Sequence, residues 1–434
     1  MNFTDRITYR FYNVNPAMLV VYNFGNGATY YYDSVSAELL YALLKKDEKQ
    51  VRLLIDKYDI SSEVYQSFIQ ECETLFNTNC IPLYKDGNEE LIDNSTIISQ
   101  VQNDLYKQNI LYRFHIDITH KCNLRCIHCY HPFEKYERDT MSFDEIKRLF
   151  SVLYDMGVFL ITISGGEPFL RKDIVDILEE GGKYGFVFQI LTNATLLNED
   201  DIKRLSQLNV SKLSFSYYGN DDAQTKITGN KKFREHLMTV VKWCEKYNLA
   251  YELKFILLKL NIGDFDDYVE LCKELRVKPL FEPCLIPKLN GDKSNFESKL
   301  DFETYKRFMK EHVHYFYDGI DMAQYAEKVI NCSAGRYGLY CDFKGDVFPC
   351  VSYREPLGTY TDIKNIWNKS EKLLKLRDRK HNQFKTFNKY SFCKYCYQIC
   401  PGLSLCENGD SLECKNSGCL VAEVIESVKN EENF

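Results

Sequence analysis

Apolar and polar positions in the middle of the chain alternate between two kinds of pattern. Between segments with helical periodicity lie six short apolar runs, at residues 114–119, 159–164, 186–191, 212–218, 251–258 and 279–286. Short apolar runs that recur between helices are typical of β-strands in strand–helix repeats. The pattern therefore predicts an α/β fold with a parallel sheet, curled or open, and right-handed crossovers.

The helical segment at residues 142–157 has recognisable ends. Ser142 stands three residues before Glu145, which is a capping-box signature, and Gly157 is suited to end the helix. In folds of this class the working residues gather at the C-terminal ends of the strands. We therefore expect functional side chains directly after the predicted strands.

The two ends of the chain have different patterns. Residues 19–34 form two short runs around an Asn-Gly turn, a strong hairpin signal, and helical segments follow at 35–45, 47–57 and 62–77. A hairpin and three helices without a chemical motif indicate a small binding module, and the polar segment 85–96 reads as a linker. The predicted division is a module at 1–90, a linker at 91–110, an α/β domain at 111–310 and a cysteine-rich region at 311–434.

Charge and hydropathy exclude two classes of function. The net charge of −7 argues against a nucleic-acid-binding surface, which is normally basic. The N-terminus has no signal-peptide pattern, and no apolar run reaches the roughly 18 residues that a membrane span needs. We expect a cytoplasmic protein that binds neither nucleic acid nor membrane.

The chain has 17 cysteines, which in a reducing compartment are more easily explained as metal ligands than as disulfides. Three lie within residues 122–129 and nine lie within 332–419. The other five are predicted to be small buried hydrophobic residues: Cys72, Cys80, Cys244, Cys272 and Cys284.

Cys122, Cys126 and Cys129 have C-x3-C-x2-C spacing and follow directly after the first predicted strand of the α/β domain. A structural zinc site needs four ligands, usually in two separated pairs. Three adjacent thiolates suit an iron–sulfur cube instead, with the fourth iron open for chemistry.

The segment "SGGEPFLR" follows the second predicted strand. Gly165 and Gly166 allow a ligand to approach the backbone closely, and the Glu167 carboxylate suits an ammonium group. The structural alternative is a glycine turn before a helix that has Pro168 in its first turn.

These two motifs together resemble the radical S-adenosylmethionine (radical SAM) family over roughly residues 111–290. The resemblance implies a partial (β/α)6 barrel in which Cys122, Cys126 and Cys129 hold a 4Fe–4S cluster. In this family the open iron chelates the amino and carboxylate groups of S-adenosylmethionine, whose reductive cleavage gives a 5′-deoxyadenosyl radical. Gly165, Gly166, Glu167 and Pro168 would orient the methionine amine.

Smaller matches extend the resemblance. Asn193 lies in the family's third-strand motif as a cofactor contact, followed by Ala194 where a glycine is usual. Ser216 would contact the ribose or the carboxylate, and Lys254 the carboxylate; the alternative is that both are satisfied polar residues of the barrel. His128 stands where the family often has an aromatic residue near adenine, and it either packs there or faces solvent.

The cysteine-rich end resembles the SPASM extension of radical SAM enzymes, which carries auxiliary 4Fe–4S clusters. The match rests on Cys332, Gly345 and Cys350 and on the later C-x2-C pair, whereas the next spacings are x3 then x5 instead of the commoner x5 then x3. Cys400, before Pro401, resembles a variant with a C-P-G element. The implied ligands are Cys332, Cys341, Cys350, Cys393, Cys396, Cys400, Cys406 and Cys419.

Two points stay open at this end of the chain. Nine cysteines exceed the eight that two cubes need, so at least one of Cys341, Cys406 and Cys414 is expected to be free. A zinc ribbon is the alternative, because C-x2-C pairs serve zinc equally well.

The N-terminal module resembles the winged-helix (RRE/PqqD-like) domain that recognises leader peptides of ribosomally made, modified peptides. Such a domain binds its leader as an added strand; the alternative is a helical adaptor or dimerisation unit. The resemblances imply a peptide maturase with three 4Fe–4S clusters that installs a thioether or carbon–carbon cross-link. Its partners would be a precursor peptide and a flavodoxin- or ferredoxin-like electron donor. The rivals are a sulfatase-maturase-like enzyme oxidising one residue of a folded protein, and a non-catalytic iron–sulfur scaffold.

Overall fold

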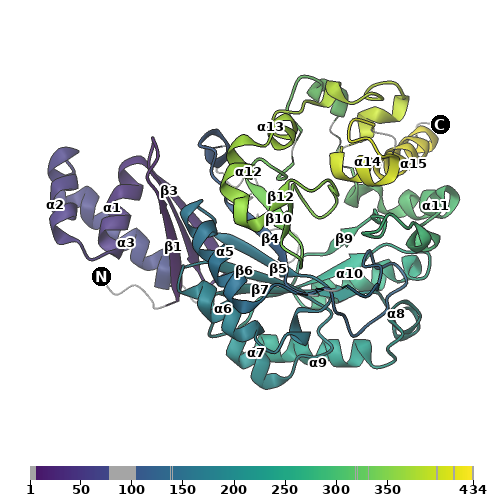
Figure 1. The fold of residues 1–434 in the computed structure, drawn as a ribbon, viewed down its shortest axis with the longest axis horizontal. Helices are drawn as coiled ribbons and strands as arrows, with labels where there is room; N and C mark the ends of the chain where they lie inside the picture. Colours follow the sequence, from purple (N-terminus) through teal and green to yellow (C-terminus); the bar gives the residue numbers. More distant parts are fainter. Residues whose placement is uncertain are drawn as a thin grey trace.

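The computed structural model describes residues 6–77, 104–136, 138, 140–317, 319, 321–330, 332–396, 399–413 and 416–432 (Figure 1). The predicted linker segment 85–96, together with Cys80 and Cys414, lies outside the described residues. Among the helices that are described, none is long and apolar enough to cross a membrane.

A sheet of nine strands, in the order β12-β11-β10-β4-β5-β6-β7-β8-β9, forms the centre of the molecule (Figure 1). Six neighbouring strands, β4 to β9, pair with one another in parallel and correspond to the six predicted apolar runs. They are β4 (Arg113–Asp117), β5 (Leu160–Ser164), β6 (Val187–Thr192), β7 (Val210–Tyr217), β8 (Tyr251–Ile256) and β9 (Leu280–Glu282). The prediction of an α/β fold with a parallel sheet is confirmed.

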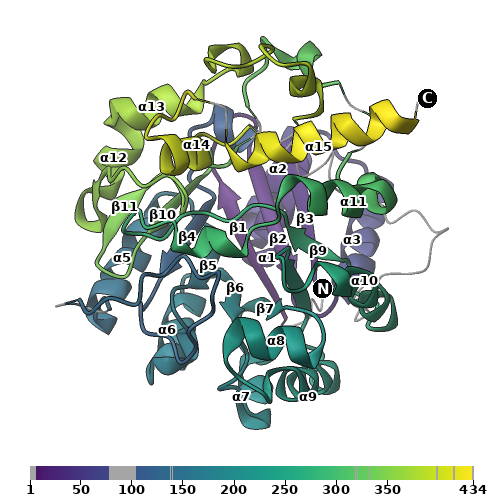
Figure 2. The same cartoon turned by 90° about the vertical axis from the view of Figure 1, so that its right-hand side faces the viewer.

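Helices connect these strands, and both views place α6, α7 and α9 on the side of the sheet away from α14 and α15 (Figures 1 and 2). The connecting helices are α5 (Phe143–Asp155), α6 (Ile174–Gly182), α7 (Glu199–Leu205), α8 (Asp221–Thr228), α9 (Phe233–Lys246) and α10 (Phe265–Glu274). The predicted capping box of α5 is present: Ser142 Oγ accepts from Glu145 N at 3.3 Å, and the Glu145 carboxylate accepts from Ser142 N at 2.9 Å.

The cysteine-rich region continues the same sheet, which the sequence pattern did not predict. Strand β10 (Gly338–Cys341) pairs in parallel with β4, and β11 (Asp346–Phe348) and β12 (Gly358–Thr359) extend the edge in antiparallel. These strands have only two to four residues, too few for a periodicity to show. The pairing of β10 with β4 therefore joins the two regions through backbone hydrogen bonds.

The remaining elements of the C-terminal third are mostly short. The helices are α11 (Phe302–His312), α12 (Ile363–Lys369), α13 (Glu371–Arg377), α14 (Pro401–Asn408) and α15 (Ser417–Glu432). Short 3-10 helices occur along the whole chain, at η1 (Pro168–Leu170), η2 (Ile262–Asp264), η3 (Ser294–Ser298), η4 (Val313–Tyr315), η5 (Met322–Tyr325), η6 (Tyr360–Asp362), η7 (His381–Gln383) and η8 (Ser391–Tyr395).

Side chains alternate across the first strands of the barrel. Phe114 and Ile116 of β4 are buried in the main apolar core with the surrounding helices. Because successive side chains of a strand point to opposite faces, His115 and Asp117 face the inner side of the sheet. The interior of the barrel is therefore polar at this strand, as expected of a surface that meets a ligand rather than a core.

The N-terminal module is a three-stranded antiparallel sheet with three helices. The predicted hairpin is β2 (Met18–Asn23) and β3 (Ala28–Asp33), and the predicted helices are α1 (Ser34–Leu44), α2 (Glu48–Lys57) and α3 (Ser62–Asn77). Strand β1 (Ile7–Tyr12) is an addition that the sequence analysis missed. It pairs along its full length with β2, whose six residues are all buried.

Both faces of this small sheet are covered. Leu19 and Val21 pack with the module's own helices, whereas Met18 and Val20 pack in a second cluster with Phe159 and other residues at the base of the barrel.

The barrel residues that contact the module precede or begin the parallel strands. Tyr12 donates to Gly157 O at 2.9 Å and Thr8 Oγ1 donates to Gly185 O at 3.0 Å, just before β5 and β6. The module therefore docks on the N-terminal ends of the strands, opposite the ends where function is expected.

Candidate functional site

Three thiols of the loop after β4 lie close together. Cys122 and Cys129 are each close enough to act electrostatically on Cys126, and Cys129 N donates to Cys126 O at 3.1 Å. The backbone N–H groups of Leu124 and His131 donate to the Sγ atoms of Cys122 and Cys129, each at 3.4 Å. The loop thus presents three neighbouring sulfurs, two of them already stabilised by backbone donors.

The electrostatics of these thiols fit a positively charged iron cluster. Burial raises the pKa of Cys126, and it raises that of Cys129 to about 11, so thiolates here require a cation. Within the described ranges, no three His, Cys, Asp or Glu side chains are arranged to bind one metal ion together. A cube differs from such a site because it takes each thiolate on a separate iron.

The loop after β4 is held against the loop after β5 by backbone pairing. Gly166 N donates to Thr119 O and Glu167 N donates to Lys121 O, both at 2.8 Å. A Cβ on Gly165 would lie 2.1 Å from Thr119 O, and one on Gly166 would lie 2.1 Å from Lys121 O. Gly165 also has φ +130, which L side chains rarely adopt. The glycines are therefore required for the two loops to meet, besides giving a ligand access.

Glu167 is a fully buried carboxylate at the junction of three strand ends. It accepts hydrogen bonds from Thr192 Oγ1 at 2.7 Å, Asn193 N at 2.8 Å and Phe169 N at 3.1 Å. Burial nevertheless raises its pKa to about 7, against these three bonds. The carboxylate is fixed in place, and a nearby cation would stabilise its charged form. Pro168 begins η1 directly after it.

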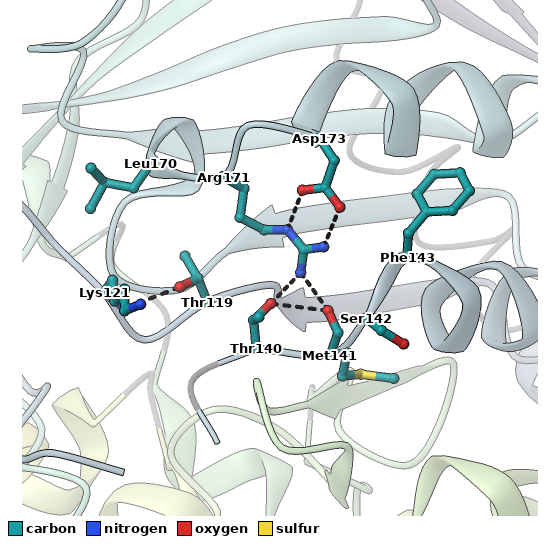
Figure 3. Close-up of a pocket in the computed structure, with 9 residues that line it drawn as sticks. All are labelled: Thr119, Lys121, Thr140, Met141, Ser142, Phe143, Leu170, Arg171 and Asp173. Atoms are coloured by element: carbon teal, nitrogen blue, oxygen red, sulfur yellow. Dashed lines mark hydrogen bonds and ion pairs between the residues drawn. The ribbon is translucent and has the colours of Figure 1, made fainter. Parts of the chain in front are cut away.

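Arg171 links several segments near the glycine turn, and Figure 3 shows its guanidinium between Asp173 and the Thr140–Met141 segment. Its guanidinium pairs with Asp173 through bonds of 2.9 and 2.7 Å, and Nη1 donates to Ile118 O at 2.9 Å and to Met141 O at 2.7 Å. Nη1 also bonds Thr140 Oγ1. The Arg171 side chain thereby links η1 both to the end of β4 and to the segment that precedes α5. Sequence analysis missed this role, although Arg171 ends the quoted glycine segment.

His128 is buried, so the alternative that it faces solvent is wrong. Its ring centroid lies 5.0 Å from that of Tyr218, and Nε2 lies 3.4 Å from the Tyr218 hydroxyl. Burial lowers the pKa of His128 to about 4, so the ring is neutral. Tyr218 also interacts with Cys126. The sequence analysis did not identify Tyr218, because it considered only Ser216 of the same motif.

The other predicted cofactor contacts lie at the same end of the barrel. Ser216 and Lys254 are directly paired across β7 and β8. Asn193 Nδ2 lies 3.9 Å from Cys122 Sγ and donates to Asn123 Oδ1 at 3.0 Å. Ala194 has φ +64, which is the physical reason that a glycine is usual at this position.

The C-terminal cysteines that are described fall into two groups. Cys332 and Cys400 both act electrostatically on Cys350, which places these three thiols together. Cys393 begins a C-x2-C pair on η8, and η8 packs against α15, which carries Cys419. Cys332 also packs in one apolar cluster with Cys419, so the two groups are neighbours.

Cys341 and Cys406 occupy different environments. Cys341 is fully buried in the main core on β10, where its nearest charged neighbours are aspartates rather than thiols. The structure therefore does not bring Cys341 to the other predicted ligands, because strand pairing with β4 fixes it in the barrel wall. Cys406 Sγ donates to Ser352 O at 2.7 Å and lies near Cys400. Cys414 lies outside the described residues.

Cys284 is half-buried and packs against the main apolar core. It also lies close to Cys400, Glu282 and Glu407, which the sequence pattern did not predict. Cys72, Cys244 and Cys272 are buried, as predicted. The fifteen described cysteines are all free thiols.

Comparison with known proteins identifies two domains. Residues 116–274 match the radical SAM superfamily, and residues 332–397 match the SPASM iron–sulfur cluster-binding domain. The first range contains the C-x3-C-x2-C loop and the glycine turn, and the second contains Cys332, Cys350 and the C-x2-C pair.

Individual relatives differ in how much of the chain they share. The AdoMet-dependent heme synthase of Methanosarcina barkeri is 25% identical over 68% of this chain and 93% of its own length. The PqqA peptide cyclase of Bradyrhizobium diazoefficiens is 25% identical over 37% of this chain, and the match spans 43% of the cyclase. The crystal structure of Streptococcus suis SuiB bound to precursor peptide SuiA covers 96% of this chain and 99% of its own, at 16% identity and a TM-score of 0.61. The last comparison shows that the fold is shared.

Replacing Gly166 with alanine tests the loop pairing. The new Cβ would clash with Lys121 O and push the cysteine loop away, at a cost of about 1–3 kcal/mol. We expect the iron bound after anaerobic reconstitution to fall by about one cluster. Gly263→Ala is the matched control, because a Cβ there meets nothing within 4 Å. Equal iron in the two variants would contradict the requirement for glycine.

Proposed function

The chain belongs to the radical SAM superfamily and carries a C-terminal SPASM domain, and we propose that it is a maturase that cross-links a ribosomally made precursor peptide. Its cofactors are S-adenosylmethionine, a radical SAM 4Fe–4S cluster and auxiliary clusters of the SPASM domain. When bound, these cofactors would supply a 5′-deoxyadenosyl radical that takes one substrate hydrogen. The auxiliary clusters would accept the remaining electron as a second hydrogen leaves as a proton and the thioether or carbon–carbon bond forms. The reducing electron comes from a flavodoxin- or ferredoxin-like donor in the cytoplasm.

Each predicted residue has a role that its position supports. Cys122, Cys126 and Cys129 hold three irons of the cluster, and the Glu167 carboxylate accepts a hydrogen bond from the methionine amine. The backbone of Gly165 and Gly166, followed by Pro168, forms the turn beside it. The remaining cofactor contacts are polar or aromatic side chains at the same strand ends: Asn193, Ser216, Lys254, His128 and Tyr218.

The two thiol groups of the SPASM region hold the two auxiliary clusters. Cys332, Cys350 and Cys400 hold the first, with Cys406 beside them as a fourth thiol. Cys393, Cys396 and Cys419 hold the second. This ligand set leaves out Cys341, whose place in the barrel wall is remote from both groups.

The N-terminal module is the observation that carries the choice of a peptide substrate. The fold likeness to SuiB includes the module and covers 96% of this chain, whereas the heme synthase covers 68%. SuiB is bound to a precursor peptide, and another relative is a peptide cyclase. A sulfatase-maturase-like enzyme would not need such a module. A non-catalytic scaffold would not need Glu167 buried beside the cysteine loop.

The leader peptide is proposed to add a strand to β3. Both faces of the module's sheet are covered, so an added strand must use an edge. Ser34 N donates to Ala17 O at 2.8 Å, and hydrogen-bonded pairs alternate along an antiparallel ladder. The N–H groups of Thr29, Tyr31 and Asp33 therefore point away from β2, toward an added strand.

The position of the module sets the spacing of the substrate. The leader binds near the N-terminal ends of the barrel strands, whereas the chemistry occurs at their C-terminal ends. A five-residue strand such as β5 spans roughly 17 Å. The peptide between leader and modified residue must at least cover that height.

Iron analysis tests the cluster assignment. Anaerobically reconstituted protein should contain up to about twelve irons, from three cubes of four. Replacing Cys122, Cys126 and Cys129 with alanine should remove about one cube and all cleavage of S-adenosylmethionine. Cys341→Ala is the control, since its thiol lies apart from the proposed ligands, and it should keep the full iron content. Cleavage by the triple variant, or stoichiometric zinc at the C-terminal sites, would contradict the assignment.

The pKa of Glu167 predicts how cofactor binding depends on pH. The methionine amine of S-adenosylmethionine donates to the ionised carboxylate, whose pKa is raised to about 7 in the free protein. Affinity should therefore rise with pH through 7, level off above it, and fall about tenfold per unit below. Because the folded chain holds this proton more tightly than the unfolded chain, Glu167 also lowers the stability of the free protein as pH rises from about 4.5 to 7.

Equilibrium dialysis of S-adenosylmethionine between pH 6 and 8.5 measures this effect. Glu167→Gln should bind roughly tenfold to hundredfold more weakly, through loss of a bond to a charged group. It should also lose the pH dependence while it keeps its iron. A pH profile shared by wild type and variant would mean that Glu167 does not contact the cofactor.

Proline on the edge of β3 tests leader recognition in the full chain. Deleting the module would expose apolar residues at the base of the barrel. A point substitution avoids this exposure and changes only the edge of β3. Thr29→Pro removes an outward N–H from an exposed position and should weaken leader binding and turnover of the full precursor. Thr29→Val keeps the N–H and serves as the control. Unchanged processing of the precursor by Thr29→Pro would show that the leader does not bind at this edge.

A further inference from the structure

The barrel interior holds a group of buried polar atoms without hydrogen-bond partners among the described residues. They are His115 Nε2, Asp117 Oδ1, His131 Nε2, and Nε and the second terminal nitrogen, Nη2, of Arg354. A buried polar atom that lacks a partner costs roughly 1–3 kcal/mol, and most such atoms in proteins are satisfied. Several of them in one place indicate a group that completes their bonds.

These atoms surround Asp117. Asp117 Oδ1 lies 3.6 Å from His115 Nε2, and Oδ2 lies 4.0 Å from His131 Nε2. Tyr340, on β10, donates to Oδ2 at 2.6 Å, and its ring centroid lies 5.9 Å from the centre of the Arg354 guanidinium. The charge of Arg354 acts on Asp117 and both histidines. We call these five residues the lumen cluster.

The lumen cluster lies between the two cofactor regions. His131 comes two residues after Cys129. Arg354 comes four residues after Cys350, and its charge also acts on Cys406. A substrate that loses a hydrogen near the first region and an electron to the second has to sit between them.

The free atoms specify the chemistry of the ligand. Nε and Nη2 form one edge of the guanidinium, a pair of donors suited to a carbonyl or carboxylate oxygen. Asp117 Oδ1 offers an acceptor close by. Because Arg354 and Asp117 carry opposite charges, a neutral group with both a C=O and an N–H fits better than a carboxylate, which Asp117 would repel.

We infer that the lumen cluster binds a backbone amide of the substrate peptide next to the residue that is modified. Arg354 donates to the carbonyl oxygen, and Asp117 accepts from the N–H. Tyr340 is a positioning residue, because it holds Asp117 rather than the peptide. The inference rests on the proposed function, since it takes the substrate to be a peptide.

The test uses the full-length reconstituted enzyme and, as probes, synthetic peptides made from short reading frames that flank its gene. Arg354→Gln and Asp117→Asn should each raise the KM for the peptide about tenfold to hundredfold. Arg354→Lys keeps the charge but loses the paired donors, so it should recover only part of the loss. Tyr340→Phe should raise KM by less than Asp117→Asn. Arg336→Gln is the matched control, because Arg336 Nε is also buried without a partner but lies outside the cluster, and it should keep the wild-type KM.

Three further measurements separate the outcomes. Iron content equal to wild type shows that a variant is folded. An unchanged affinity for S-adenosylmethionine excludes a cofactor site, and a fall in it would overturn the inference. A peptide whose acidic residues are replaced by their amides should bind normally; loss of binding would show that a carboxylate is the ligand. Wild-type KM values in both Arg354→Gln and Asp117→Asn would overturn this inference but leave the proposed function standing. Failure of the wild-type enzyme to modify the precursor would overturn both.

Discussion

Backbone pairing between the loop after β4 and the loop after β5 positions everything else at the site. Gly166 N and Glu167 N bond to the carbonyls of Thr119 and Lys121, so the cysteine loop starts from a fixed edge. Two positions without Cβ atoms make this approach possible. Glu167 is then carried into the junction of strands with its carboxylate already hydrogen-bonded, beside the sulfur of Cys122. A few backbone hydrogen bonds thereby hold both the proposed cluster ligand, Cys122, and the proposed cofactor contact, Glu167.

The shared sheet explains how the barrel and the cysteine-rich region act together. Because β10 pairs with β4, Tyr340 and Asp117 come from neighbouring strands although they are far apart in the sequence. Arg354 follows from the same C-terminal region and reaches the barrel interior. The polar interior is therefore built by both regions, and a change in either one alters the surface that the substrate meets.

The N-terminal module is a more independent unit, with its own apolar core. Its docking on the N-terminal ends of the strands leaves the C-terminal ends free for cofactors and substrate. In the proposed function, recognition and chemistry are thus separated by the height of the barrel. This arrangement suits a long, extended substrate better than a small molecule.

The sequence by itself determined the order of elements and the chemistry of the central loop. Strand–helix alternation gave the six parallel strands, and the spacing of Cys122, Cys126 and Cys129 indicated an iron–sulfur site, because both depend on local patterns. The tertiary structure decided what depends on contacts between distant residues. The short strand β10 shows no periodicity, so the place of Cys341 in the barrel wall was not predictable. Cys284 packs against the core, as the sequence suggested, but only the fold brings it near Cys400. Asp117, Tyr340 and Arg354 form one polar group only because strands far apart in the sequence pair with one another. The spacing of these residues along the chain gives no indication of that pairing.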